Sequence, residues 1–546
     1  MTSLPSDAAP SPPAPVAVGT EGRLGIYPAA DFRVTDGRDA DAPTIRQALW
    51  YFRDETIAVP KPGLPVASFT PGVRTFDDVR AWAAARPADA PVDLPPLVWL
   101  AAPQVLRGAR LSADATRLET AGDALPLRLV PKIPLNRSYF DASSAAFLRE
   151  RTVAARGTVA TDGFIARTLW PEDFRLGGDA PLRVLPKKRS AAKALRRMIR
   201  DVPRGGAASP FVANALWRRD AGDWTGRTVL AFMLNGAQGD DDEAHGGHFA
   251  IVTGQIEADG AIGNWLVDNF YTLDSESEKG ILAAPVPLDD YLADLNAGQA
   301  WYRPSYLVVA VLSSPRAAEL VQSALGRVYN QFYRHQLSYY HPDQNCTSIS
   351  VDTLRALGWK VPGRGATSTV LGALTFPLIA LKDRSISKAK LAFDYLNTDQ
   401  TRMLPAAAFE QIFASLWAMA HDPGARAAGR SGTLGQMLAE DLTAIAWLRF
   451  PQLPSSRALG AAPAVTTWEY RAMVPADPAM AQIVPVPPRP FPDELRDPDL
   501  LPPLRPPSDI VAMVWGVLLV VGIPWVVRAL WQRWRERGTG AAARER

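Results

Sequence analysis

The pattern of hydrophobic and polar residues sharpens after residue 206 into a series of short apolar runs. Four of these runs are rich in β-branched and aromatic residues and are bounded by Gly, Asp or Pro, which is typical of strands. They are residues 228–234, 249–256, 265–271 and 306–312. A turn-forming stretch separates the second run from the third, so we expect these two to form an antiparallel hairpin.

Two helical patterns are predicted after the strands. Apolar residues recur at helical spacing between residues 316 and 336, at Leu320, Ala324, Val328 and Phe332. A shorter amphipathic helix is predicted over 346–357, where Gly358 supplies a stop signal. Residues 206–375 therefore indicate an α+β core, in which an antiparallel sheet comes first and a helix that begins at Cys346 comes last.

The regions that precede the core differ from it in composition. Residues 1–21 are rich in Pro, Ala and Ser and predict a disordered leader. Residues 22–205 contain short strand-like runs, of which 97–100 and 127–130 are the clearest, and they predict a β-rich accessory domain.

A helical C-terminal extension is predicted over residues 376–450. One helix presents an apolar face made of Phe409, Ile412, Phe413, Leu416, Trp417 and Ala420, and a second helix is expected over 434–448. Residues 451–509 are rich in proline and predict a semi-extended linker.

The end of the chain has the composition of a membrane anchor. Residues 510–527 form an uninterrupted apolar run, which predicts one transmembrane helix over 510–530. The tail 531–546 is basic, and the positive-inside rule places it in the cytoplasm. The same rule places the globular part outside, which needs an export signal, but residues 1–23 show neither the basic nor the apolar region of a signal peptide. The side of the membrane that holds the globular part is therefore left open. We expect a single-pass protein of the bacterial inner membrane, with the lipid bilayer as a partner.

The cysteine content and the net charge exclude several kinds of site and partner. One cysteine among 546 residues excludes an intramolecular disulfide framework and any site that needs several cysteines. The formal net charge of +3 is spread along the chain, so nucleic acid is not an implied partner.

The single cysteine, Cys346, is the main functional signal because it lies where an aromatic, polar loop enters a predicted helix. A thiol at a helix N-terminus feels unpaired N–H groups and the positive end of the dipole, which favour the thiolate. His248 stands at the start of a predicted strand and supplies an imidazole. The two residues can form a nucleophile and general-base pair, whereas a lone cysteine is otherwise often an inert buried residue.

An imidazole base also needs a polar group that orients it. The predicted partner strand carries Asp268 and Asn269, and only one of these neighbours can face His248 because alternate side chains point to opposite faces. Asp268 is narrowly favoured, and Asn269 stays open. The backbone N–H of Cys346 is the expected oxyanion donor, with Gln344 or Asn345 as helpers.

Other histidines offer alternatives. His341 precedes Cys346 by five residues and is a second candidate for the base. His245 and His248, beside the acidic run 240–243, would suit a metal ion, but four consecutive acids are more typical of a solvated turn. We therefore predict no metal and no cofactor.

The order of these motifs carries a resemblance. Gly-Gly-His at a strand start, a paired strand with a polar residue, a long helix and then Tyr-x-x-x-x-x-Asn-Cys-Thr resemble the circularly permuted NlpC-type papain-like fold. Within that superfamily, residues 206–365 are most similar to the Lnb-type periplasmic domain. The resemblance implies a nucleophile at Cys346, a base at His248, and cleavage of amides or esters or acyl transfer between lipids and lipoproteins.

Two functions are therefore expected. The first is a membrane-anchored thiol hydrolase or acyltransferase that acts on an amide, ester or thioester through an acyl-enzyme at Cys346, with a lipid, lipoprotein or cell-wall substrate. The alternative is a catalytically silent envelope scaffold or binding protein in which the cysteine is merely packed.

Overall fold

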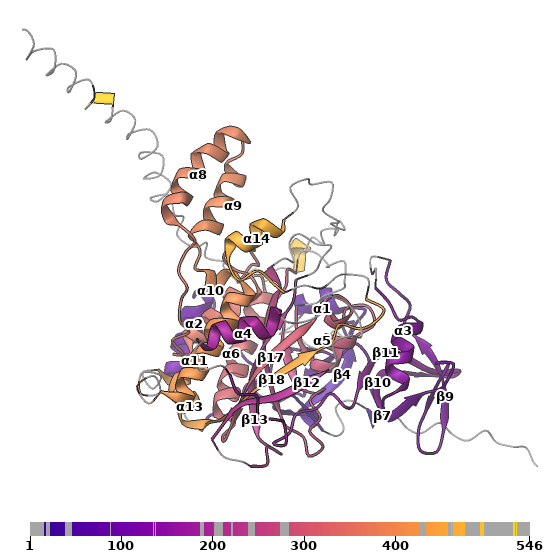
Figure 1. Ribbon diagram of the computed structural model, residues 1–546. Coiled ribbons are helices and arrows are strands. Elements are labelled where there is room, and N and C mark those ends of the chain that lie inside the picture. Colours follow the sequence, from indigo (N-terminus) through magenta and orange to yellow (C-terminus); the bar gives the residue numbers. More distant parts are fainter. Residues whose placement is uncertain are drawn as a thin grey trace, which may run out of the picture.

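Figure 1 shows a computed structural model of the chain. It describes residues 16–17, 22–38, 46–185 except 88, 135 and 137, 190–200, 211–219, 222–237, 246–273, 283–422, 424, 427, 432–456, 460, 462–474, 492–495, 528–529 and 531. The predicted leader, the proline-rich linker, the transmembrane span and the basic tail lie largely or wholly outside these residues.

A seven-stranded antiparallel sheet forms the centre of the molecule. In spatial order its strands are β12 (Val212–Arg218), β18 (Leu442–Phe450), β17 (Ser305–Leu312), β13 (Thr228–Asn235), β14 (His248–Gln255), β15 (Leu266–Asp268) and β16 (Pro285–Pro287). All four strands predicted beyond residue 206 are present, and β14 and β15 form the predicted antiparallel pair.

Helices cover one face of this sheet. The register places Trp447, Val308, Phe232 and Ile251 directly opposite one another, so their side chains share that face. Trp447 packs on Phe409 of α11 (Pro405–His421), and Phe232 packs on Trp359, which follows α7 (Cys346–Ala356). Thr253, two residues beyond Ile251, donates a hydrogen bond to Gln322 of α6 (Arg316–Tyr333). The predicted apolar faces of α6 and α11 are packing surfaces, because Leu320, Ala324, Val328 and Phe332 of α6 and Phe409, Ile412, Phe413 and Leu416 of α11 are all buried.

The N-terminal part of the chain is rich in strands. A six-stranded sheet has the order β1 (Val16–Ala17), β7 (Gln104–Leu111), β10 (Val153–Ala160), β11 (Gly163–Pro171), β9 (Ala124–Leu129) and β8 (Arg117–Glu119), and a further β7–β8 pairing closes five of these strands into a ring. Smaller sheets are formed by β2 (Arg23–Leu24) with β3 (Tyr27–Pro28), and by β4 (Phe32–Asp36), β5 (Thr56–Pro60) and β6 (Val98–Trp99).

Buried ion pairs join this N-terminal part to the central sheet and its helices. Asp78 of α2 (Thr75–Ala85) accepts two hydrogen bonds of 2.9 Å from Arg327 of α6. Arg156 of β10 bonds Asp289 of α5 (Leu288–Ala293) at 2.8 Å, again out of contact with solvent. Breaking one partner of such a pair leaves an uncompensated buried charge, so these contacts strongly constrain how the two parts dock.

The remaining helices are mostly short. They are α1 (Arg46–Phe52), α3 (Ala142–Arg149), α4 (Ala191–Arg200), α8 (Thr369–Lys382), α9 (Ile386–Asn397), α10 (Gln400–Met403), α13 (Thr433–Asp441) and α14 (Thr467–Met473), with 3-10 turns at Ala29–Asp31, Gln299–Trp301 and Asp493–Leu495. Helices α8 and α9 form a hairpin that projects from the body of the molecule (Figure 1).

The α+β class agrees with the sequence, but the predicted fold class is wrong in its transmembrane helix. Among the described residues, no helix combines the length and the apolar character that crossing a membrane requires. The most apolar helix, α8, has 14 residues and is about 21 Å long, whereas the hydrocarbon core of a bilayer is about 30 Å thick. The span predicted over 510–530 lies almost entirely outside the described residues.

The helix predicted over 434–448 is also wrong. The chain forms α13 only as far as Asp441, and β18 then lies in the sheet between β12 and β17. A strand that is buried in this way has an almost continuous run of apolar residues in its sequence. Periodicity alone cannot distinguish such a run from a buried helix.

Candidate active site

Cys346 is the first residue of α7, and the start of that helix is firmly capped. The Asn345 side-chain oxygen accepts hydrogen bonds from the N–H groups of Thr347 at 2.8 Å and Ser348 at 3.0 Å. The Ser348 hydroxyl in turn accepts the Asn345 N–H at 2.8 Å, which completes a capping box. This arrangement holds the thiol in the N-terminal turn, where the dipole stabilises negative charge.

The capping role removes Asn345 as an oxyanion donor. Its side-chain nitrogen donates to the carbonyl oxygens of His341 at 2.7 Å and Met403 at 3.1 Å. Both the oxygen and the nitrogen of the amide are therefore already hydrogen-bonded to backbone groups. The backbone of Gln344 pairs with that of Tyr340 through two hydrogen bonds. The part of the Gln344 side chain in stabilising an oxyanion stays a prediction.

His248 is the first residue of β14 and lies opposite Asn235 of β13. The residue before it, Gly247, has a φ of +78°, and a Cβ there would come within 2.5 Å of the Asn235 carbonyl oxygen. Only glycine allows this close approach in the left-handed region without strain. The Gly-Gly-His motif therefore has a structural reason, because Gly247 sets the entry of the strand that carries the imidazole.

Asn269, and not Asp268, lies against the imidazole. The His248 Nε2 atom is 2.5 Å from Asn269 Oδ1, which makes Nε2–H the donor and the amide oxygen the acceptor. Because Nε2 is occupied in this way, Nδ1 is the nitrogen left to exchange a proton with Cys346.

Asp268 points to the opposite face of β15. It pairs with Ile251 in the sheet, and its Oδ1 accepts a hydrogen bond of 3.2 Å from Gln322 of α6. Burial raises the pKa of Asp268 well above its ordinary value. Burial of this kind favours the protonated carboxyl, and the Asp268 side chain has no part in the arrangement around Cys346.

The thiol of Cys346 is activated by its surroundings. Burial alone would raise the pKa of Cys346, but the positive charge of the His248 ring and a hydrogen bond from it act in the opposite direction and outweigh burial. Further hydrogen bonds from the Phe249 N–H and from Thr347 also favour the thiolate, and the pKa falls to about 7. A thiol with this pKa is substantially ionised at neutral pH, as a nucleophile requires.

Tyr339 is a site residue that the sequence reasoning missed. Its hydroxyl oxygen accepts a hydrogen bond of 3.4 Å from the Cys346 N–H, and the hydroxyl also forms a hydrogen bond with the thiol. Burial, followed by the charge of Cys346, raises the pKa of Tyr339 well above its ordinary value, so the group keeps its proton and is a donor. Tyr339 is the tyrosine of the Tyr-x-x-x-x-x-Asn-Cys-Thr motif, which therefore contained the signal.

The other histidines lie elsewhere. His341 Nδ1 is 2.6 Å from the Tyr395 hydroxyl of α9, and His421 Nδ1 donates to the Trp417 carbonyl oxygen at 3.0 Å. His245 and the acidic run 240–243 lie outside the described residues. Within the described part of the chain, no three His, Cys, Asp or Glu side chains are grouped so that they could hold a metal ion.

Comparison of the chain with family models, with curated proteins and with solved structures gives no match. The likeness to the Lnb-type domain and to the wider papain-like fold therefore stays a prediction.

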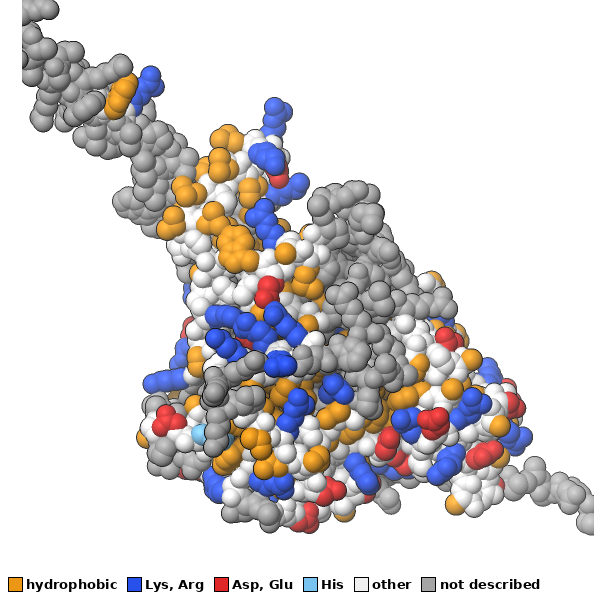
Figure 2. All heavy atoms as spheres, in the orientation of Figure 1, with side chains coloured by type: hydrophobic (Ala, Val, Ile, Leu, Met, Phe, Trp, Pro, Cys, Tyr) orange, Lys and Arg blue, Asp and Glu red, His pale blue; other side chains and the backbone are white. Residues whose placement is uncertain are grey.

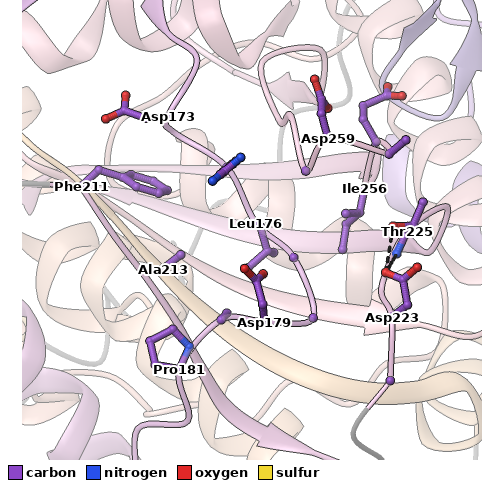
Figure 3. A pocket seen from close by; sticks show the side chains of 18 residues that line it. Asp173, Leu176, Asp179, Pro181, Phe211, Ala213, Asp223, Thr225, Ile256 and Asp259 are labelled. Carbon is purple, nitrogen blue, oxygen red and sulfur yellow. Dashed lines mark hydrogen bonds between the residues drawn. The ribbon is translucent and has the colours of Figure 1, made fainter. Parts of the chain in front are cut away.

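A cavity of about 720 Å³ lies at the far end of the central sheet (Figure 3). It is bordered by the turn after β14, by the turn before β13 and by the segment 173–181. Its acidic lining residues are Asp173, Asp179, Asp223, Glu257 and Asp259, and its one basic lining residue is Arg175. The eight-residue strand β14 separates it from His248 by roughly 25 Å.

Proposed function

We propose that the protein is a thiol hydrolase or acyltransferase that forms an acyl-enzyme at Cys346. The arrangement that carries the proposal is the buried series Cys346, His248 and Asn269, in which each member has the partner that its role needs. A structural ion pair also shifts pKa values, but an activated thiol at a capped helix start, beside an oriented imidazole, is the arrangement that thiol catalysis requires.

The reaction divides into two acyl transfers. The Cys346 thiolate attacks the carbonyl carbon of an amide, ester or thioester, and a C–S bond forms while the carbonyl oxygen becomes an oxyanion. The Tyr339 hydroxyl is the donor that stabilises this oxyanion, and the Cys346 N–H joins it once the substrate displaces the hydrogen bond of 3.4 Å from that N–H to the hydroxyl. The protonated His248 gives its proton to the leaving group, whose bond to carbon breaks, and the acyl-enzyme remains.

The second transfer regenerates the thiol. His248, now neutral, accepts a proton from water or from another nucleophile, which attacks the thioester carbon and displaces Cys346. Water gives hydrolysis, and an amine or alcohol gives acyl transfer. Asn269 keeps the ring in one tautomer through both steps. A lipid, lipoprotein or cell-wall acyl donor remains the predicted substrate class.

A second candidate is a binding protein that uses the same fold without catalysis. The observation in its favour is the burial of Cys346, whose residue is only 5 % exposed. Among buried residues, a packed and inert cysteine is common.

Alkylation of the single thiol separates the two candidates. Iodoacetamide should add one group per native chain, and the rate should reach half its maximum near pH 7, because the pKa of Cys346 is about 7. The mass of the intact chain gives the extent of reaction, and Cys346→Ala is the matched control that should gain no mass. A thiol that reacts only after denaturation would favour the binding protein.

A further inference from the structure

The α8–α9 hairpin exposes an unusual amount of apolar surface. Its exposed apolar side chains are Val370, Leu374, Leu378, Leu381, Ile386 and Leu391, and Leu381 and Ile386 are 78 % and 73 % exposed. Figure 2 shows hydrophobic side chains gathered on the projecting part of the molecule. Contiguous patches of this kind mark interaction sites, unlike the single exposed apolar residues found on every protein.

Helix α8 has a composition that water does not favour. Eleven of its fourteen residues, TVLGALTFPLIALK, are apolar or glycine, and Lys382 at its end is the only charged residue. Four exposed residues, Val370, Leu374, Leu378 and Leu381, recur at intervals of three and four and form one stripe along the helix. Gly372 is the only residue of α8 that is buried. A helix that is apolar on all sides is normally enclosed by protein or by lipid.

Basic residues surround the tip of the hairpin. Lys382, Arg384 and Lys388 are exposed there, together with Asp383, and Lys390 pairs with Asp394 at 2.5 Å. Figure 2 shows Lys and Arg side chains along the outer edge of the apolar surface. An apolar stripe with cations at its border matches the acyl chains and anionic headgroups of a lipid surface.

We propose that the α8–α9 hairpin docks onto an anionic lipid surface. The stripe on α8 enters the acyl boundary and the basic tip contacts phosphate headgroups. At about 21 Å, α8 is too short to span the bilayer, so the hairpin lies at the interface. The charge pattern selects lipid over an apolar protein partner, because a protein groove would bury the cations next to the apolar stripe at a desolvation cost.

The base of the hairpin is tied to the loop that leads to Cys346. The Tyr340 hydroxyl donates to Asp394 of α9 at 2.7 Å, and the Tyr395 hydroxyl is 2.6 Å from His341 Nδ1. Docking would therefore hold lipid next to α9, the helix that contacts the loop before Cys346. The proposal goes beyond the proposed chemistry and does not depend on it.

A position-specific dye tests the docking in the full chain. Leu381→Cys in a Cys346→Ala background gives one labelling site for an environment-sensitive fluorophore and contains no catalytic thiol. Val184→Cys in the same background is the matched control, because Val184 is 75 % exposed but lies outside the hairpin. Vesicles of phosphatidylcholine with 30 % phosphatidylglycerol should shift the emission at Leu381 to the blue, and the emission at Val184 should stay unchanged.

Three results would overturn the proposal. The first is the absence of a shift at Leu381 with these vesicles, and the second is an equal shift at Val184. The third is a dye at Leu381 that is already shielded without vesicles and does not respond to them, which would mean that the surface is covered by another part of the chain, such as 510–527, or by a second copy. Dependence of that shielding on protein concentration would distinguish these two occupants.

Substitutions separate the apolar contribution from the charge contribution. Leu378→Gln should raise the lipid concentration for half-maximal shift by roughly tenfold with every vesicle, because it removes the burial of one leucine side chain. Lys382→Gln, Arg384→Gln and Lys388→Gln should each raise it by roughly fivefold with anionic vesicles, and should have little effect with pure phosphatidylcholine. Since all four residues are exposed, melting temperatures should stay unchanged, and equal effects of the charge substitutions on both vesicles would contradict the anionic surface.

Discussion

The two ends of the central sheet gather polar side chains in different ways. At the end where β14 begins, Cys346, His248 and Asn269 are all buried and interact with one another. At the opposite end, the carboxylates around the cavity are mostly exposed, and two of them accept hydrogen bonds from their own turns, Asp223 from Thr225 and Asp259 from Ala261.

This difference decides which end is suited to chemistry. Groups that are buried together change one another's pKa strongly, whereas exposed groups are screened by water. The cavity in Figure 3 is therefore not the proposed active site, although a concave pocket is a common place to look for one. Asp223 and Asp259, two of its carboxylates, accept hydrogen bonds from their own turns instead of from each other.

The largest effect is expected from His248→Ala. Without the imidazole, burial dominates and the pKa of Cys346 should rise from about 7 to above its ordinary value near 8.5. Acylation of Cys346 by an activated thioester probe, followed by intact mass, should slow by roughly 10² to 10⁴ at pH 7.

Alkylation of the same His248→Ala variant is the control, because this reaction needs the thiolate but no general acid. Its rate at pH 7 should fall by only about fivefold or somewhat more, because a thiolate of higher pKa is scarcer but intrinsically more nucleophilic. The midpoint of its pH profile should move to more alkaline pH. An unchanged midpoint would contradict the assignment of His248 as the partner of the thiol.

Tyr339→Phe should have the next largest effect. Loss of an oxyanion donor costs roughly 10² to 10³ in acylation rate. Alkylation by iodoacetamide passes through no oxyanion, so at a pH where the thiol is fully ionised its rate should change little. Equal losses in both reactions would mean that Tyr339 only positions Cys346.

Asp268, the last residue of β15, and Asn269, which follows it, should give smaller effects that differ from each other. Asn269→Ala should lower acylation by roughly 10-fold to 10², since the imidazole loses its orientation. Asp268→Asn should leave acylation within about twofold of the wild-type rate, as its side chain lies on the face covered by α6. A reversed order of the two losses would contradict the register of β14 and β15.

Asp268→Asn also has an expected effect on stability. The pKa of Asp268 is raised in the folded state, so its stabilising contribution is fully present below about pH 4 and is lost as the pH rises toward the folded pKa. The amide does not ionise. The variant should therefore melt at a higher temperature than the wild type near pH 7 and at the same temperature near pH 3.

These neighbours show what sequence could and could not settle. The start of α7 and the entry of β14 were predictable because local signals set them, namely the Asn-Cys-Thr cap and the Gly-Gly-His turn. The choice between Asp268 and Asn269 depends on register, and the ten residues between Gln255 and Leu266 leave a shift of one residue open, which would move every side chain to the other face. Asp268 was narrowly favoured, but its side chain bonds Gln322 of α6 while Asn269 contacts His248.

Long-range pairing explains the other departures. Strand β18 joins the sheet between β12 and β17, which are more than 200 and 100 residues away in the sequence. No local pattern records such neighbours, so its apolar run was predicted to be helical. The role of Tyr339 was not predicted for a similar reason. The fold of the loop before α7, and not the spacing of the motif alone, brings its hydroxyl to the Cys346 N–H.

The smallest effect is expected at the acidic end of the sheet. Burial raises the pKa of Glu257, and its neighbour Asp259 adds to the shift while Arg107 opposes it. Because the folded pKa is raised, the contribution of Glu257 to stability is present below about pH 4 and is lost at higher pH. Glu257→Gln should therefore raise the melting temperature slightly near pH 7, leave it unchanged near pH 3, and leave acylation of Cys346 unaltered. A loss of acylation of several-fold, with the melting temperature maintained, would show that the two ends of the sheet are coupled and would remove the contrast between them.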